Sequence, residues 1–148
     1  MLTLATLLLV TSCVKFKQNT VGVSPQGEKL AASENLYYRF NITDTTVPYK
    51  IFFSARLSNK FILNNLPLGI LYISPQGKRY SDTIRLYLNE TDPHTEFVKN
   101  GNWRDYRWLY RDGAMFPEKG IWLVSVKNIH IKEMYGIREL ALSLKQKR

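Results

Sequence analysis

From residue 36 onward, apolar side chains recur at every second position in short runs that end at turn-forming residues. Successive residues of a β-strand point to opposite faces of a sheet, so this period of two predicts strands with one buried and one exposed face. The clearest run covers residues 49–57. Its apolar face would be formed by Tyr49, Ile51, Phe53, Ala55 and Leu57. Because no convincing helical period accompanies these runs, the sequence predicts an all-β protein.

The runs are short and turn residues separate them, which is the pattern of an antiparallel β-sandwich, Ig-like or jelly-roll-like. Predicted strands cover residues 36–42, 49–57, 68–74, 83–88, 103–110, 121–126 and 140–144. Residues 74–77 form a predicted turn, and residues 129–135 are ambiguous between a strand and a short helix. The side chains expected to be mostly buried are Phe40, Ile42, Ile51, Phe53, Ile84, Leu86, Trp122, Val124, Leu140 and Leu142.

The N-terminal stretch from Leu2 to Cys13 is apolar and ends in the tetrapeptide Val10-Thr11-Ser12-Cys13. It is too short for a membrane-spanning helix, which needs about 20 apolar residues, but it suits the apolar part of a secretory signal. An aliphatic residue and two small residues before a cysteine form a bacterial lipobox. Cys13 would then be lipidated and become the first residue of the mature protein. The alternative is a short buried segment with a core cysteine.

This interpretation divides the chain into a signal peptide (1–12), a lipidated tether (13–35) with an edge strand near residues 20–23, and a sandwich domain (36–148). Cys13 is the single cysteine, so no disulfide is expected. No acidic cluster follows it, which favours a lipid-anchored protein of the bacterial cell envelope that faces the periplasm. No second apolar run is long enough to span a membrane.

The net charge of +9 is compatible with nucleic-acid binding, but an exported lipoprotein meets little nucleic acid. Anionic lipid headgroups, acidic glycans or an acidic protein surface are better counterparts. The alternative is a generally basic, well-solvated surface.

No sequence signature of an enzyme is present. The hydrolase, zinc-protease, P-loop and dinucleotide-binding motifs are missing, and the two histidines, His94 and His130, are far apart in sequence. The aspartates lie near turns, where their side chains bond the backbone, and lack the spacing of a calcium loop. We therefore predict no catalytic residues, no metal site and no cofactor.

The segment 103–112 has the most unusual composition, with aromatic residues and arginines interleaved. As a strand it would place Tyr106, Trp108 and Tyr110 on one face and Arg107, Leu109 and Arg111 on the other. Aromatic rings beside arginines suit sugar stacking or a protein-interface hot spot. The alternative is an aromatic face in the core and solvated arginines. The candidate partner contacts are Trp103, Tyr106, Arg107, Trp108, Tyr110 and Arg111.

Several short motifs follow the lipobox in a particular order. They are Phe40-Asn41-Ile42-Thr43-Asp44-Thr45-Thr46-Val47-Pro48-Tyr49, Pro75-Gln76-Gly77, Asp82-Thr83, Gly101-Asn102-Trp103, Phe116-Pro117-Glu118-Lys119-Gly120 and Gly136-Ile137-Arg138-Glu139-Leu140-Ala141-Leu142. Together they resemble the gliding-motility lipoprotein H (GldH) family over nearly the whole mature chain. The resemblance implies a membrane-anchored lipoprotein that supports gliding and the type IX secretion machinery, contacts other proteins of that machinery, and has no enzymatic activity. Of the functional positions, only Cys13 carries over. A lipid-anchored carbohydrate-binding module is the alternative.

Overall fold

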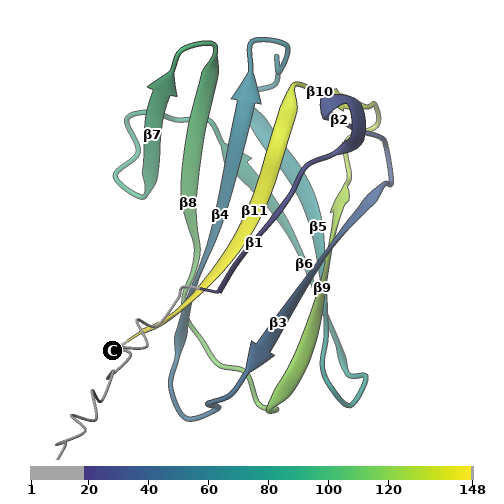
Figure 1. Cartoon of the computed structure of the whole chain (residues 1–148), viewed down its shortest axis with the longest axis vertical. Helices are drawn as coiled ribbons and strands as arrows, with labels where there is room; N and C mark the ends of the chain where they lie inside the picture. Colours follow the sequence, from purple (N-terminus) through teal and green to yellow (C-terminus); the bar gives the residue numbers. More distant parts are fainter. Residues whose placement is uncertain (1–18, 148) are drawn as a thin grey trace, which may run out of the picture.

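The computed structural model describes residues 19–147 and is built from β-strands packed as two sheets (Figure 1). The strands are β1 (Asn19–Val23), β2 (Lys29–Leu30), β3 (Asn35–Ile42), β4 (Tyr49–Ser58), β5 (Asn65–Ile73), β6 (Arg79–Tyr87), β7 (Thr95–Asn100), β8 (Trp103–Ala114), β9 (Gly120–Asn128), β10 (Met134–Tyr135) and β11 (Ile137–Gln146). The large sheet has the order β1-β11-β4-β8-β7, and the small sheet has the order β3-β9-β5-β6. β2 and β10 form a separate short pair, and one 3-10 turn, η1 (Gln26–Glu28), precedes β2.

All strand pairs are antiparallel, so the predicted antiparallel sandwich is confirmed. Each of the seven predicted strands overlaps an observed one, and the edge strand predicted near residues 20–23 is β1. The turn at residues 74–77 joins β5 to β6, where the Gly77 N–H donates to the Ser74 carbonyl at 2.9 Å. In the described residues no helix is long and apolar enough to cross a membrane.

The sequence did not predict β7 or the short pair β2–β10. Residues 129–135 form bends and β10 in place of a helix. Buried Asn128 fixes this loop, since its amide donates to the carbonyls of Leu30 and Lys132 and its oxygen accepts the N–H of His130. A polar residue at the end of a strand gave no sequence signal of this long-range role.

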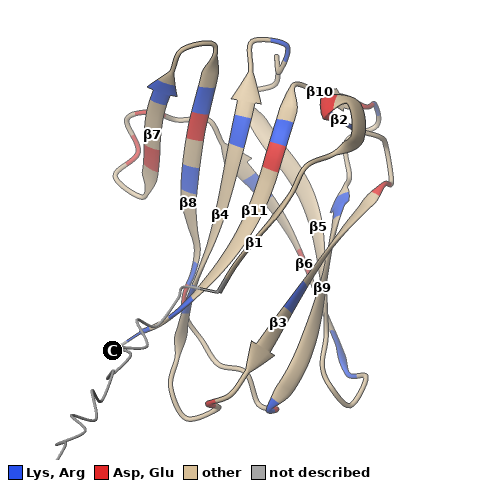
Figure 2. Ribbon diagram, in the orientation of Figure 1, with Lys and Arg blue, Asp and Glu red and all other residues tan. Residues whose placement is uncertain are grey.

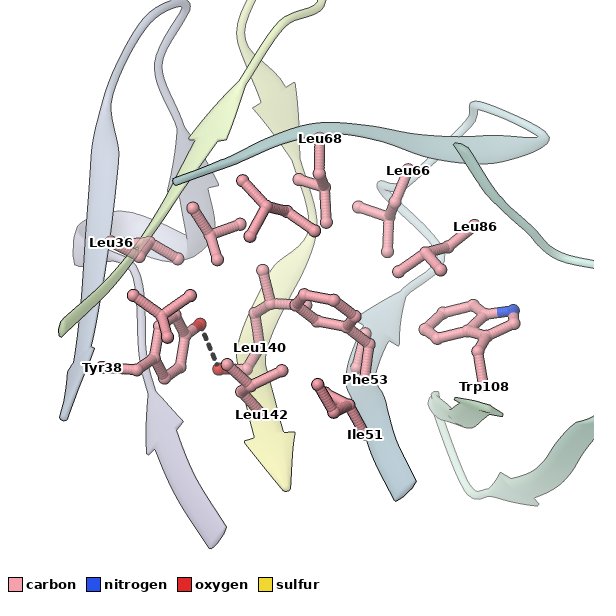
Figure 3. Close-up of a cluster of buried hydrophobic side chains, with 14 of the residues drawn as sticks. Leu36, Tyr38, Ile51, Phe53, Leu66, Leu68, Leu86, Trp108, Leu140 and Leu142 are labelled. Carbon is pink, nitrogen blue, oxygen red and sulfur yellow. Dashed lines mark hydrogen bonds between the residues drawn. The ribbon is translucent and has the colours of Figure 1, made fainter. Parts of the chain in front are cut away.

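The core lies between the two sheets (Figure 3). Of the side chains expected to be buried, all are buried except Ile84, which is half-buried on the edge strand β6. One polar bond crosses the core: the Tyr38 hydroxyl of the small sheet donates to the Leu140 carbonyl of the large sheet at 2.8 Å. Burial raises the pKa of this hydroxyl, so it remains a protonated donor. The bond satisfies a buried hydroxyl and fixes the relative position of the sheets.

The folded part begins before residue 36. In the segment that the sequence assigns to a tether, residues 19–23 pair with β11, and Leu30 is fully buried in the core. The physical reason is that the apolar residues of this segment find partners only across the sandwich, so their spacing along the chain carries little periodicity. Residues 1–18, with the predicted signal peptide and the start of the tether, lie outside the described residues.

Candidate functional site

The aromatic face of β8 points into the sandwich. Tyr106 and Trp108 are 2% and 5% exposed, and Tyr110 is half-buried with its ring 5.4 Å from the ring of Phe53. Tyr110 faces inward by the same alternation as Tyr106 and Trp108, and a β-bulge beside it sets Arg111 opposite the inward-facing Ile51, on the same side as Tyr110. This burial removes Tyr106 and Trp108 from any surface that a partner could contact.

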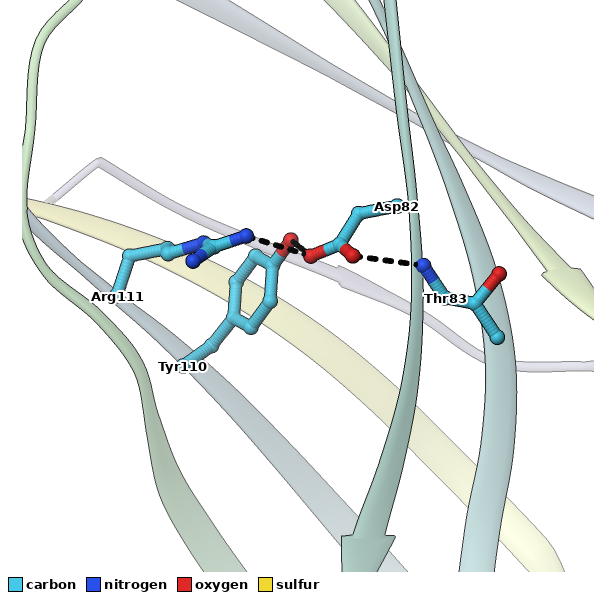
Figure 4. A network of polar contacts seen from close by, with 4 residues as sticks. All are labelled: Asp82, Thr83, Tyr110 and Arg111. Carbon is cyan, nitrogen blue, oxygen red and sulfur yellow. Dashed lines mark hydrogen bonds and ion pairs between the residues drawn. The ribbon is translucent and has the colours of Figure 1, made fainter.

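The polar ends of these aromatic side chains bond to groups on and beside β6 of the opposite sheet. The Trp108 indole N–H donates to the Tyr87 carbonyl at 2.8 Å, and the Tyr110 hydroxyl donates to the Asp82 carboxylate. The Arg111 guanidinium lies 2.8 Å from the same carboxylate, and the Thr83 N–H donates to its other oxygen (Figure 4). We call Asp82, Tyr110 and Arg111 the cross-sheet latch. It closes the side of the sandwich where β6 and β8 face each other.

The latch keeps Asp82 ionised. The hydrogen bond from Tyr110 lowers the pKa of the Asp82 carboxyl, against a partial offset from burial, and Thr83 and Arg111 add to the lowering. The Tyr110 pKa is raised, first by burial and then by its bond to this carboxylate. The pKa of this carboxyl is lower in the folded than in the unfolded protein. Asp82 therefore stabilises the fold at pH values above 3.8, the ordinary pKa of an aspartate. That stability is lost as the pH falls through the lowered folded value.

We predict that Tyr110→Phe lowers the free energy of unfolding by about 1–2 kcal/mol at neutral pH, because it removes a hydrogen bond to a charged group. The loss should shrink as the pH falls from 3.8 through the lowered pKa of Asp82, because the carboxylate of the folded protein becomes protonated there. Urea unfolding of the folded domain at several pH values measures both effects. Tyr135→Phe is the matched control, since Tyr135 donates to Glu133 on the exposed surface. An equal loss in the two variants would contradict a structural role for the latch.

A cavity of about 490 Å³ lies beside the latch, between the two sheets. Its lining includes the rings of Tyr72, Tyr80, Tyr110 and Trp122 together with the Asp82–Arg111 pair. The Tyr72 hydroxyl is buried and has no hydrogen-bond partner among the described residues, and burial raises its pKa. Aromatic walls with a few convergent polar groups are the usual make-up of a small-molecule site.

The strands of the large sheet carry basic and acidic residues together (Figure 2), and several of these charges are paired on its outer face. Arg56 makes two bonds to the Asp105 carboxylate, at 2.7 and 2.9 Å. Arg107 points outward from β8, with its guanidinium 3.7 Å from the centre of the Phe52 ring and 3.4 Å from Glu96. The alternation expected for residues 103–112 therefore holds for the inward aromatic rings and for the outward Arg107, but it is wrong for Arg111, which the bulge turns toward Asp82 of the opposite sheet.

The remaining sequence-predicted positions are dispersed. Trp103 is half-buried at the start of β8 beneath the Arg138 guanidinium, 4.9 Å from its ring centre. His94 and His130 lie in separate loops, and no cluster of His, Cys, Asp and Glu able to hold a metal occurs within residues 19–147. Cys13 lies outside the described residues.

No motif in the sequence marks the outer face of the small sheet. Four basic residues point outward there, Arg39, Arg79, Arg85 and Lys127. In the sequence, each of these basic residues lies an odd number of positions from the inward-facing residues of its strand, so it is expected to face outward. The outward positions of these strands also carry no acidic residue. Recognising them as one surface required the pairing of strands that are far apart in sequence.

Comparison with known proteins gives two results. A family model described as GldH lipoprotein matches residues 27–144, which include the strands from β2 to most of β11 but not Cys13. A curated protein of Christiangramia forsetii, the "Gliding motility lipoprotein GldH homolog", is 28% identical over 99 residues. That alignment covers 66% of this chain and 61% of the relative, so the matched part spans about three fifths of the relative's length.

Proposed function

Because this chain belongs to the GldH lipoprotein family, we propose that it is a membrane-anchored accessory lipoprotein of bacterial gliding motility. The proposal includes support of the type IX secretion machinery, protein–protein contacts as the mode of action and no catalytic step. The observation that carries it is the family match over the folded domain, together with the gliding role in the name of the relative. The proposed location is the cell envelope, with the lipid on Cys13 and the domain facing the periplasm.

Most of the unusual side chains of β8 are used inside the fold, which leaves Arg107 as the contact residue of this segment on the outer face. Trp108, Tyr110 and Arg111 have hydrogen-bond partners on β6 of the opposite sheet, so their chemistry is used to hold the sandwich closed. On the outer face of the large sheet, Arg107 remains a proposed contact residue. A partner would have to compete there with Phe52 and Glu96 for the guanidinium, which lowers the gain from any new contact.

We expect deletion of the gene to abolish gliding and to reduce export by the type IX machinery, and the full-length gene to restore both. Cys13→Ser should fail to restore them, because the protein would be released from the membrane or kept as an uncleaved precursor. Each buried methylene of an acyl chain contributes about 0.8 kcal/mol, so several chains hold the protein firmly and their loss is decisive. Colony spreading, secreted protein and membrane fractionation are the measurements.

Normal gliding and export after deletion would refute the accessory role. A Cys13→Ser protein that is processed and fractionates with membranes like the wild type would refute the lipobox. The two experiments test the accessory role and the lipid anchor separately, because the deletion phenotype does not depend on how the protein reaches the membrane.

The second candidate function is a lipid-anchored carbohydrate-binding module. Tyr106 and Trp108 are buried and cannot stack on a sugar. The feature that favours this candidate is instead the aromatic cavity, where the Tyr72 hydroxyl has no hydrogen-bond partner among the described residues. This candidate takes first place if the deletion strain glides and exports normally.

A further inference from the structure

The outer face of the small sheet has an aliphatic centre between two basic edges. The register places Arg79 beside Ile73, Ile73 beside Leu123 and Leu123 beside Arg39, so one row of side chains crosses all four strands. The next row is formed by Ser81, Leu71, Ser125 and Tyr37. We call this surface the basic sheet face. It consists of Tyr37, Arg39, Leu71, Ile73, Arg79, Arg85, Leu123 and Lys127.

Within the described part of the chain, the charges of this face form no ion pair with a carboxylate. Arg39, Arg79, Arg85 and Lys127 take part in none of the ion pairs found within residues 19–147. The one acidic residue on the four strands is Asp82, which points inward and is held by the latch. In Figure 2, β3 and β9 accordingly carry only basic bands, whereas β7, β8 and β11 carry basic and acidic bands together.

We infer that the basic sheet face is the docking surface for an acidic segment of a partner protein. This inference rests on the proposed accessory function and specifies that the partner is an acidic protein. Leu71, Ile73 and Leu123 are each half-buried, so a partner would gain by covering the apolar surface that remains, and acidic groups around that contact would meet the four cations. The arginines and the tyrosine that flank the aliphatic centre are residue types enriched in interface hot spots.

A second copy of this chain does not fit the surface. A symmetric dimer through this face would place the four cations of one copy against the same four cations of the other. The outer face of the large sheet offers no acidic excess either, because Asp105 and Glu96 are paired with Arg56 and Arg107, and Lys50 and Lys145 outnumber the remaining Glu139. Charge complementarity therefore requires a different molecule.

A membrane surface fits less well than a protein. Anionic headgroups would attract the four cations. The aliphatic side chains, however, lie on a strand face and do not project from a loop, so they would rest against a hydrated headgroup layer with little apolar surface buried. A protein surface can cover them and meet the charges at the same time.

The size of the face indicates a contact of moderate strength. Strands are spaced at about 4.8 Å and rise about 3.3 Å per residue, so four paired strands present roughly 20 by 25 Å. That is on the order of 500 Å², below the roughly 800 Å² per partner of a standard stable interface. A covalent trap in living cells is therefore a better test than a pull-down.

The test places a photo-crosslinking phenylalanine derivative at position 37 of the full lipoprotein in its native cells. Tyr37 is 59% exposed on the basic sheet face, and Tyr135, 53% exposed on β10, is the control position. Charge is reversed with Arg39→Glu plus Arg79→Glu. The matched control is Lys50→Glu plus Lys145→Glu, a registered pair on the outer face of the large sheet that gives the same change in net charge.

We expect a protein adduct at position 37 that maps to an acidic segment and is absent at position 135. Charge reversal on the basic sheet face should reduce this adduct at least tenfold and stop gliding, whereas the control pair should leave both unchanged. Introducing lysine into the mapped acidic segment should restore the adduct. No adduct, an adduct to lipid or to a second copy, or an adduct insensitive to charge reversal would overturn the inference.

The same strains separate this inference from the proposed function. If deletion of the gene stops gliding but cells with Arg39→Glu plus Arg79→Glu glide normally, the docking surface is refuted and the accessory function stands. If deletion itself leaves gliding and export intact, the accessory function is refuted, and the adduct alone then decides whether the face binds an acidic protein.

Discussion

Gly136→Ala is expected to lower the free energy of unfolding by about 3–6 kcal/mol, because a conformational cost and a steric cost add at this position. Gly136 joins β10 to β11 with a φ of +83°, which costs an alanine about 1–2 kcal/mol. An added Cβ would also lie 2.5 Å from the backbone nitrogen of Phe61 and 2.7 Å from the Ser58 hydroxyl. The glycine cannot move aside, because its N–H bonds the Glu28 carbonyl and its carbonyl accepts the Ser58 N–H, both at 2.8 Å.

Gly77→Ala is the matched control for this prediction. Its φ is +85°, almost the same as that of Gly136, but nothing lies within 4 Å of an added Cβ. It should therefore lose only the conformational part, about 1–2 kcal/mol. Chemical unfolding of the two variants measures the difference. Similar losses would mean that the close approach of Phe61 to Gly136 does not exist in solution.

Phe53→Ala is expected to cost about 3–5 kcal/mol, a large part of the total stability of a small domain. Phe53 is fully buried in the middle of β4, and its removal would leave a cavity between the sheets that neighbouring side chains fill only in part. The melting temperature should fall by roughly 10–20 °C, which calorimetry of the folded domain can measure.

Phe52→Ala is the control, since Phe52 is the neighbouring residue on the same strand and faces outward under the Arg107 guanidinium. It should cost less than half as much, because Phe52 buries less apolar surface than Phe53 and the arginine contact contributes about 0.5–1 kcal/mol. Equal losses at positions 52 and 53 would contradict the assignment of the two faces of β4.

The alternation of apolar residues predicted the strands well because each strand has one face in the core. In β3 and β4 every second residue is buried, as the period of two requires. β7 escaped prediction because only Thr95 and Phe97 face inward, and its other side chains are exposed at the edge of the large sheet. β2 and β10 are two residues each, too short for any period to appear.

The amino-acid sequence by itself determined the all-β class, most strands, the inward face of each and the family resemblance, because these depend on residues that are close together along the chain. Only the tertiary structure decided which residues become neighbours across strands. It turned the aromatic segment of β8 into a latch on β6, and it brought Arg39, Arg79, Arg85 and Lys127 onto one unpaired face. The reason is that strand order and register join residues far apart along the chain, such as Arg39 and Leu123, and no local pattern records such pairings.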